Sequence, residues 1–137
     1  MKEQDREVII IGREWSNQEE CDIKEYLKRA HALLATREYT IKASDKNKIF
    51  NRKYPLTDQK KTEILKSLSI DDCIAYESNN NPRYPDSTVF KFIKEVTIPV
   101  YGEMQLVKIY IKQYICENKN HELIIVISFH EEGMHDE

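Results

Sequence analysis

The segment YIKQYICENKNHELIIVISFH, residues 110–130, decides the fold that this sequence predicts. It contains the end of one strand candidate, about 104–116, and the whole of a second, about 122–130. The turn-forming stretch CENKNHE joins them, and a connection this short makes consecutive strands antiparallel neighbours. A further strand candidate, about 87–98, comes first and is joined by PVYGE. The C-terminal half therefore predicts an antiparallel meander.

The N-terminal half predicts helices. Residues 16–38 start with a cap, Ser16 or Asn17, and carry apolar residues at helical spacing. Residues 56–69 predict a second helix, with Thr57 or Asp58 as its cap.

Two shorter segments complete this picture. EYTIKA, residues 38–43, is a short strand candidate, and IDDCIAYE, residues 70–77, is interpreted as one further short turn of helix. We therefore expect an α+β fold, with N-terminal helices packed on a C-terminal antiparallel β-sheet.

Length and composition set limits on the class of protein. The 137 residues suit one domain, 1–137, in which the first dozen residues fit either an extra strand or an arm, so that 1–15 is a candidate N-terminal extension. Three cysteines without a CxxC pair indicate reduced thiols in a cytoplasmic protein. No apolar run is long enough to cross a membrane. The net charge of −3 argues against a protein that coats nucleic acid, although residues 42–61 are locally basic.

Side chains alternate along a strand, which divides each strand into two faces. On 104–116 the odd positions form the expected core face, and the even positions include Lys108, Tyr110 and Lys112. On the last strand the expected core residues are Leu123, Ile125, Ile127 and Phe129. His130 should then share the opposite face with the two lysines and the tyrosine. The preceding loop can add Arg83 and Tyr84, and the first strand of the meander can add Lys91.

This polar face has two interpretations. It is either the solvent side of a half-covered sheet, where lysine and tyrosine are common, or a concave anion site. Cations for phosphate, tyrosine for stacking and a histidine that can move protons near neutral pH together suit metal-free RNA cleavage.

The tail HEEGMH gives no metal motif. It is one residue longer than the H-E-x-x-H motif that places two histidines on one helical face, and Gly133 interrupts any helix. We expect no metal and no cofactor.

Several segments together resemble a known family. IKEYLKRAHALL, KSLSIDDCIAYE, RYPDSTVFKF, IYIKQYI and LIIVISFHEE are similar to bacterial toxins of the motility quorum-sensing regulator (MqsR) type. These are messenger-RNA endonucleases of toxin–antitoxin pairs with a RelE-like fold. The resemblance covers roughly residues 22–132.

The resemblance implies a set of site residues. The family's active-site glutamine falls at Lys91, its tyrosine falls at Tyr110 in a shared Tyr-x-Lys pattern with Lys112, and its C-terminal catalytic lysine, directly after Ser-Phe, falls at His130. A further family lysine lands near Ala75, where this chain has no base. Such toxins are usually basic, and this chain is net acidic.

The expected function is the toxin of a toxin–antitoxin pair, a metal-independent endoribonuclease. His130, Tyr110, Lys112 and Lys91 would be catalytic, and Arg83, Tyr84 and Lys108 would bind substrate. The implied partners are messenger RNA and a cognate antitoxin protein, with no membrane and no direct contact with DNA. Two alternatives remain open: a non-catalytic regulator or RNA- or protein-binding module on the same fold, and an interaction domain whose exposed sheet pairs with another chain.

Overall fold

The computed structural model describes residues 14–83, 87–118 and 121–133. Within them lie three α-helices, one 3₁₀ turn and five strands. In chain order they are α1 (Asn17–Ala35), β1 (Tyr39–Ile41), α2 (Asp45–Lys53), α3 (Asp58–Lys66), η1 (Ile70–Asp72), β2 (Cys73–Ser78), β3 (Thr88–Val100), β4 (Glu103–Asn118) and β5 (His121–Glu131). The helices precede every strand except β1, and the expected α+β class is confirmed.

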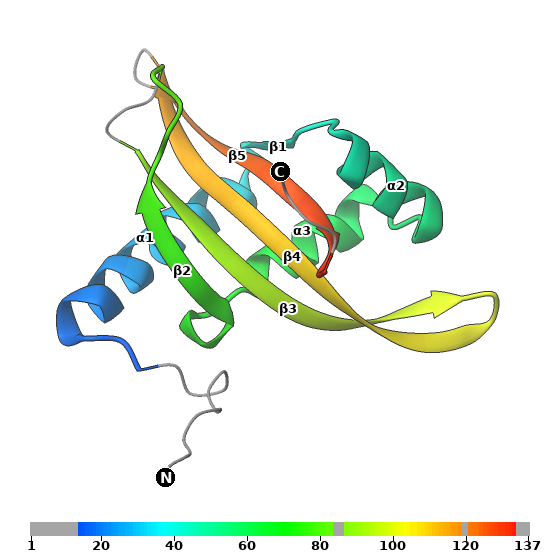
Figure 1. The fold of residues 1–137 in the computed structure, drawn as a ribbon. Coiled ribbons are helices and arrows are strands. Elements are labelled where there is room, and N and C mark those ends of the chain that lie inside the picture. Colours follow the sequence, from blue (N-terminus) through cyan, green and yellow to red (C-terminus); the bar gives the residue numbers. More distant parts are fainter. Residues whose placement is uncertain (1–13, 84–86, 119–120, 134–137) are drawn as a thin grey trace, which may run out of the picture.

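The strands form one sheet in the order β1-β5-β4-β3-β2 (Figure 1). The three strands of the predicted meander are antiparallel neighbours, as expected. The sheet as a whole is mixed rather than antiparallel, because β1 runs parallel to β5. The backbone hydrogen bonds from Ile124 N to Glu38 O (3.0 Å) and from Lys42 N to Val126 O (2.9 Å) fix this pairing.

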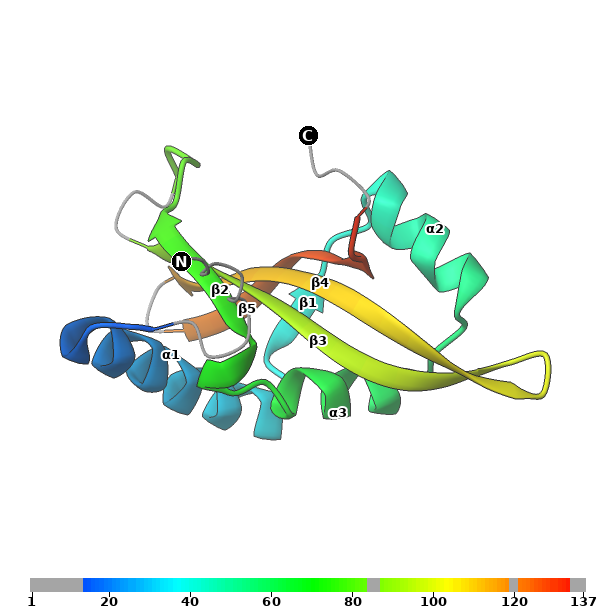
Figure 2. The ribbon, with the colours of Figure 1, turned by 60° about the horizontal axis from the view of Figure 1, so that its bottom comes forward.

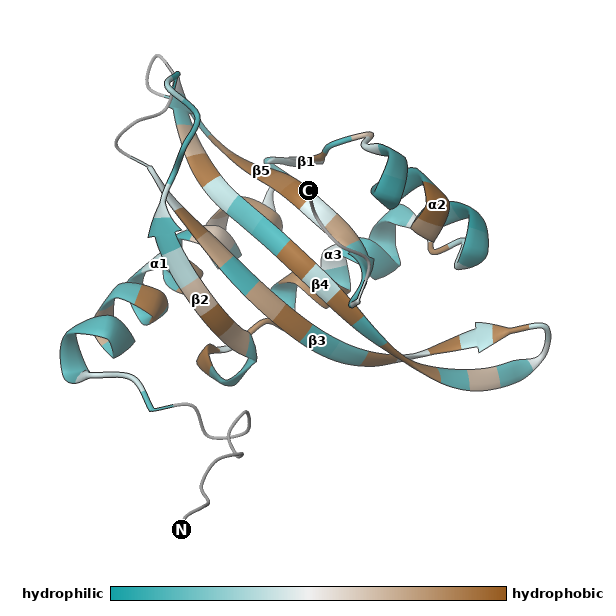
Figure 3. Ribbon diagram, in the orientation of Figure 1, coloured by the Kyte–Doolittle hydropathy of each residue, from teal (hydrophilic) through white to brown (hydrophobic). Residues whose placement is uncertain are grey.

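Helices α1 and α3 lie on one face of the sheet (Figure 2). Ser16 caps α1 in a capping box with Glu19, and Thr57 caps α3. The side chains that α1 buries are Ile23, Tyr26, Leu27, Ala30 and Leu34. Figure 3 shows the apolar positions alternating with polar ones along the central strands, as one covered face requires. We call the face turned away from α1 and α3 the far face.

The segment 70–77 corrects one prediction. Only Ile70–Asp72 is helical, and Cys73–Ser78 is strand β2. Pairing with β3 explains why residues 73–78 form a strand. Tyr76 lies opposite Phe90 of β3, and the two rings stack with centroids 5.1 Å apart. Strand preference depends more on such cross-strand contacts than on local sequence.

Helix α2 has no counterpart in the sequence prediction, which treats this stretch only as locally basic. Ser44 caps it by accepting a hydrogen bond from Asn47 N (3.2 Å). Phe50 and Tyr54, four residues apart, are both buried, and Phe50 packs edge-on against Phe129 of β5 (5.8 Å). Helix α2 thereby lies along the part of β5 that extends beyond the short β1 (Figure 1).

Strand β5 changes faces partway along its length. Ile124 and Val126 are in the core, whereas Ile125 and Ile127 pack beside Val89 on the far face, so the expected core positions are wrong for this half of the strand. The cause is a register shift between Lys112 and Gln113 of β4, which is a β-bulge at position 127. Beyond the bulge the alternation is reversed. Phe129 enters the core as expected, and Ser128 and His130 lie across from far-face residues of β4.

One side chain of α2 holds this bulge. Asn47 is 2% exposed. Its Nδ2 donates to the carbonyl oxygens of Lys42 (2.8 Å) and Ile127 (3.0 Å), and its Oδ1 accepts from Phe129 N (2.9 Å). Asn47 therefore satisfies the edge of β5 where a neighbouring strand is missing.

We expect Asn47→Ala to lower the free energy of unfolding by about 2–4 kcal/mol, because it leaves buried backbone groups of β5 without partners. Asn47→Asp should be no better, since its carboxylate would face the two carbonyl oxygens. Chemical denaturation measures both variants. Asn51→Ala, on an exposed position of the same helix, is the control and should stay within about 0.5 kcal/mol of wild type. Equal stabilities of the position-47 and position-51 alanine variants would contradict this role.

Candidate functional site

Two adjacent rows of side chains cross the far face. In one row Ile93, Tyr110 and His130 lie opposite one another on β3, β4 and β5. In the next row, Ala75, Lys91, Lys112 and Ser128 cross from β2 to β5. The rows are two residues apart along the strands, about 7 Å. The sheet thus brings together the four residues for which the sequence predicts a catalytic role.

Tyr110 and His130 form the centre of the first row. Their ring centroids are 5.6 Å apart. Tyr110 is half-buried, and His130 is 1% exposed, with Nδ1 3.1 Å from the carbonyl oxygen of Glu131. If the far face were only the solvent side of the sheet, His130 at the end of its strand would be exposed, and it is not. Any ligand on this face meets Tyr110 before it meets the histidine.

The second row places like charges side by side. Lys91 and Lys112 are directly opposite each other on β3 and β4, an arrangement that destabilises a sheet. Glu77, two residues beyond Ala75 on β2, approaches Lys91 Nζ to 3.1 Å. This contact depends on β2, in a segment for which the sequence pattern predicts a turn of helix. Two neighbouring ammonium groups on one row make this part of the far face suited to an anion.

Lys108 lies on the same face of β4, two residues before Tyr110. It lies opposite Glu95 of β3, with Nζ 3.8 Å from the carboxylate, and its side chain is 57% exposed. Lys108 therefore lies opposite an acid, whereas Lys112 lies opposite a second lysine.

The loop residues are less closely associated with the site. Arg83 is exposed in the turn after β2, and its backbone N donates to Asn81 Oδ1 (3.0 Å). No hydrogen bond or ion pair among the described residues connects it to Lys91 or Lys112. Tyr84 lies outside the described residues. Ala75, near which the resemblance would place a further lysine, lies directly opposite Lys91.

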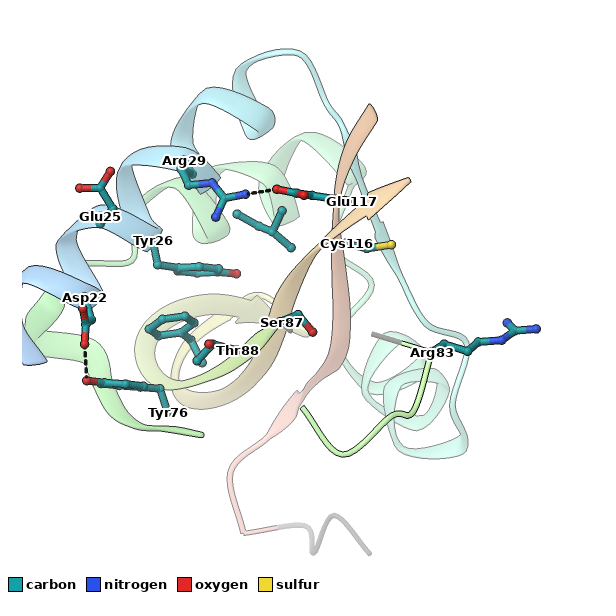
Figure 4. A pocket seen from close by; sticks show the side chains of 12 residues that line it. Asp22, Glu25, Tyr26, Arg29, Tyr76, Arg83, Ser87, Thr88, Cys116 and Glu117 are labelled. Atoms are coloured by element: carbon teal, nitrogen blue, oxygen red, sulfur yellow. Dashed lines mark hydrogen bonds and ion pairs between the residues drawn. The ribbon is translucent and has the colours of Figure 1, made fainter. Parts of the chain in front are cut away.

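A separate cavity of about 580 Å³ lies between the first helix and the end of the sheet (Figure 4). Its polar groups bind mainly to each other. Tyr76 OH donates to Asp22 (3.0 Å), and burial together with this carboxylate raises the pKa of Tyr76 to about 12. Arg29 bonds to Glu117 (3.2 Å) and lowers the pKa of Glu122. Arg83 points away from these groups in Figure 4. The cavity offers little unpaired charge to a ligand.

Other site classes find no support in the described part of the chain. No group of three histidine, cysteine or acidic side chains there could hold a metal ion, and His135 of the HEEGMH segment lies outside it. None of the described helices has the length and apolar character that crossing a membrane requires.

Comparisons of the chain with protein-family models, with curated protein sequences and with solved structures found no significant match in any of the three. The function proposed below is therefore inferred from the residues of the site.

The like-charge row gives a direct prediction. Lys112→Met should raise the free energy of unfolding by about 0.2–1 kcal/mol at low salt, because it removes an ammonium group opposite Lys91. Lys108→Met is the matched control on the same strand and face. Because Lys108 lies opposite Glu95, its substitution should leave stability unchanged or lower it. Urea titrations at low and high salt measure the stability of both variants. The difference between the two variants should be smaller at high salt, because salt screens the charge interactions. A larger loss of stability in Lys112→Met than in Lys108→Met would refute the charge assignment.

Proposed function

We propose that the protein is a metal-independent endoribonuclease with a RelE-like fold, the toxin of a bacterial toxin–antitoxin pair that cleaves messenger RNA in the cytoplasm. The observation that carries this proposal is the adjacency of the Tyr110–His130 pair and the Lys91–Lys112 pair on a sheet face that α1 and α3 leave uncovered. The resemblance to MqsR-type toxins supports it, since these positions correspond to the family's active site.

The chemistry of RNA cleavage needs the groups that these rows supply. The 2′-oxygen attacks the phosphorus, the bond to the 5′-oxygen breaks, and a 2′,3′-cyclic phosphate and a 5′-hydroxyl result. A base takes the 2′-proton, an acid protonates the leaving oxygen, and cations stabilise the crowded phosphate. We assign proton transfer to His130, and phosphate positioning to Tyr110 and Lys112. Lys91 and Arg83 would hold flanking phosphates.

Because His130 is buried, the side chains of the site would contact the RNA in a definite order. Lys112 and Tyr110 of β4 are half-buried, whereas Ser128 and His130 of β5 are each 1% exposed, so the phosphate reaches the two β4 side chains first. His130 reaches the 2′-hydroxyl only after its neighbours rearrange around the bound RNA. The Tyr110 ring, in contact with the histidine ring, is the nearest group that has to move.

A non-catalytic RNA- or protein-binding module is the second candidate. Two observations favour it: His130 is 1% exposed, and Ala75 stands opposite Lys91 where the family pattern has a further lysine. Such a module would keep the cationic row and bind RNA without cleaving it. Either function is compatible with an antitoxin-like partner protein that covers the far face.

We expect the wild-type protein to cleave RNA in the presence of EDTA, with and without ribosomes tested in parallel. His130→Ala should abolish cleavage, with a loss of at least about 100-fold, the usual contribution of a general acid or base. His121→Ala is the matched control, because His121 lies on the same strand at its far end, where it pairs with Glu38 (3.1 Å). Circular dichroism checks that both variants remain folded.

The possible outcomes separate the candidates. Equal cleavage by wild type and His130→Ala would remove His130 from the site. Binding of RNA by the wild type without cleavage, on naked RNA and on ribosomes, would favour the non-catalytic module.

A further inference from the structure

A groove of about 420 Å³ follows the outer edge of β1, away from the two rows of the site. Strand β1 is the end strand of the sheet, and α2 and the start of α3 form the other sides of the groove. The charged residues that line it are Arg37, Lys42, Lys48, Lys61 and Asp58. Four cations therefore meet one carboxylate, in a protein whose net charge is −3.

Several cations elsewhere in the described chain are bound to an acid, unlike those of the groove. Lys24, Arg29, Lys91, Lys94 and Lys108, for example, each form an ion pair. Within the described residues, none of the four groove cations does. Unpaired cations in a concave site raise the local concentration of an anionic ligand.

The backbone of Arg37 has a strained conformation. It follows the C-terminus of α1 with φ of 58°, in the left-handed region that glycine or asparagine usually occupies. A residue with a Cβ atom adopts this conformation only at a cost in free energy. This conformation places an arginine, rather than the less strained glycine, at the mouth of the groove.

The groove is connected to the proposed active site. Thr40 of β1 pairs with Ile125, a far-face residue of β5, so alternation places Lys42 on the same face as Lys112. The Asn47 amide joins Lys42 O to Ile127 O at the bulge. Two strand spacings separate β4 from β1, about 10 Å. Lys42 of the groove and Lys112 of the second row thus lie on the same face of the sheet, with β5 between their strands.

We propose that this groove binds phosphates of the RNA strand on one side of the scissile phosphate. The inference rests on the proposed ribonuclease function and adds the path of the substrate. Single-stranded RNA fits better than an acidic peptide strand, because β1 has only three residues and offers few backbone groups for strand addition. A groove lined by four cations instead suits a polymer with regularly spaced charges.

The test compares two triple variants with the same change in net charge. Lys42→Gln/Lys48→Gln/Lys61→Gln removes groove cations, and Lys24→Gln/Lys28→Gln/Lys66→Gln removes exposed lysines that do not line the groove. The probe is a fluorescent single-stranded RNA with 2′-O-methyl groups throughout, which cannot be cleaved. Binding is measured by anisotropy over a range of salt concentrations, for the full-length wild type and both variants.

We expect the groove variant to bind at least about tenfold more weakly and to reduce the slope of log K against log salt by about 2, from three lost phosphate contacts at about 0.7 each. The control variant should change neither by a comparable amount. If the wild type binds RNA but the two triple variants weaken binding equally, or the groove variant does not weaken it, the groove proposal is wrong. The ribonuclease proposal would be unaffected by either result. A wild type that binds no RNA but binds a polyglutamate peptide through the groove would overturn both proposals and indicate an acidic protein partner.

Discussion

The three hydrogen bonds of the Asn47 amide to the neighbouring backbone are the interaction on which the candidate site depends. They hold the bulge at position 127, and the bulge decides which side chains of the last strand face the helices. Without it, the alternation that buries Ile124 and Val126 would carry Ser128 and His130 into the core and turn Phe129 outward. The core and the site would then both be lost, because Phe129 packs on Phe50 and His130 lies beside Tyr110.

The far face places two like charges directly opposite each other. A sheet built only to fold would place an acid opposite Lys112, as it does opposite Lys108. Lysines face each other instead at Lys91 and Lys112, next to the aromatic pair of Tyr110 and His130. Charge repulsion within a folded state is relieved by an anionic ligand, which is why this arrangement favours a phosphate site over a plain solvent-facing sheet.

Much of the fold follows from local sequence patterns, and the exceptions have physical causes. The capped, periodic segments give α1 and α3, and the alternating C-terminal segments give the meander. Helix α2 was predictable from Ser44 as a cap and from Phe50 and Tyr54 at helical spacing, signals that its many charges hide. Strand β2 depends on its partner β3, and no window of the sequence contains both. The bulge could not be read from LIIVISF, since this run is apolar in both phases and either face can be buried.

The candidate site, too, is predictable in part from the sequence and depends in part on the tertiary structure. The neighbourhood of Lys91, Tyr110, Lys112 and His130 follows from alternation on paired strands together with the resemblance, whereas the burial of His130 and the contact of Glu77 with Lys91 needed the tertiary structure. The identity of the RNA ends left after incubation with the wild-type protein in EDTA distinguishes the proposed cleavage from other reactions. Attack by the 2′-oxygen should leave 2′,3′-cyclic phosphate and 5′-hydroxyl ends. Ends with 5′-phosphate and 3′-hydroxyl groups, or intact RNA both free and on ribosomes, would contradict the proposed cleavage.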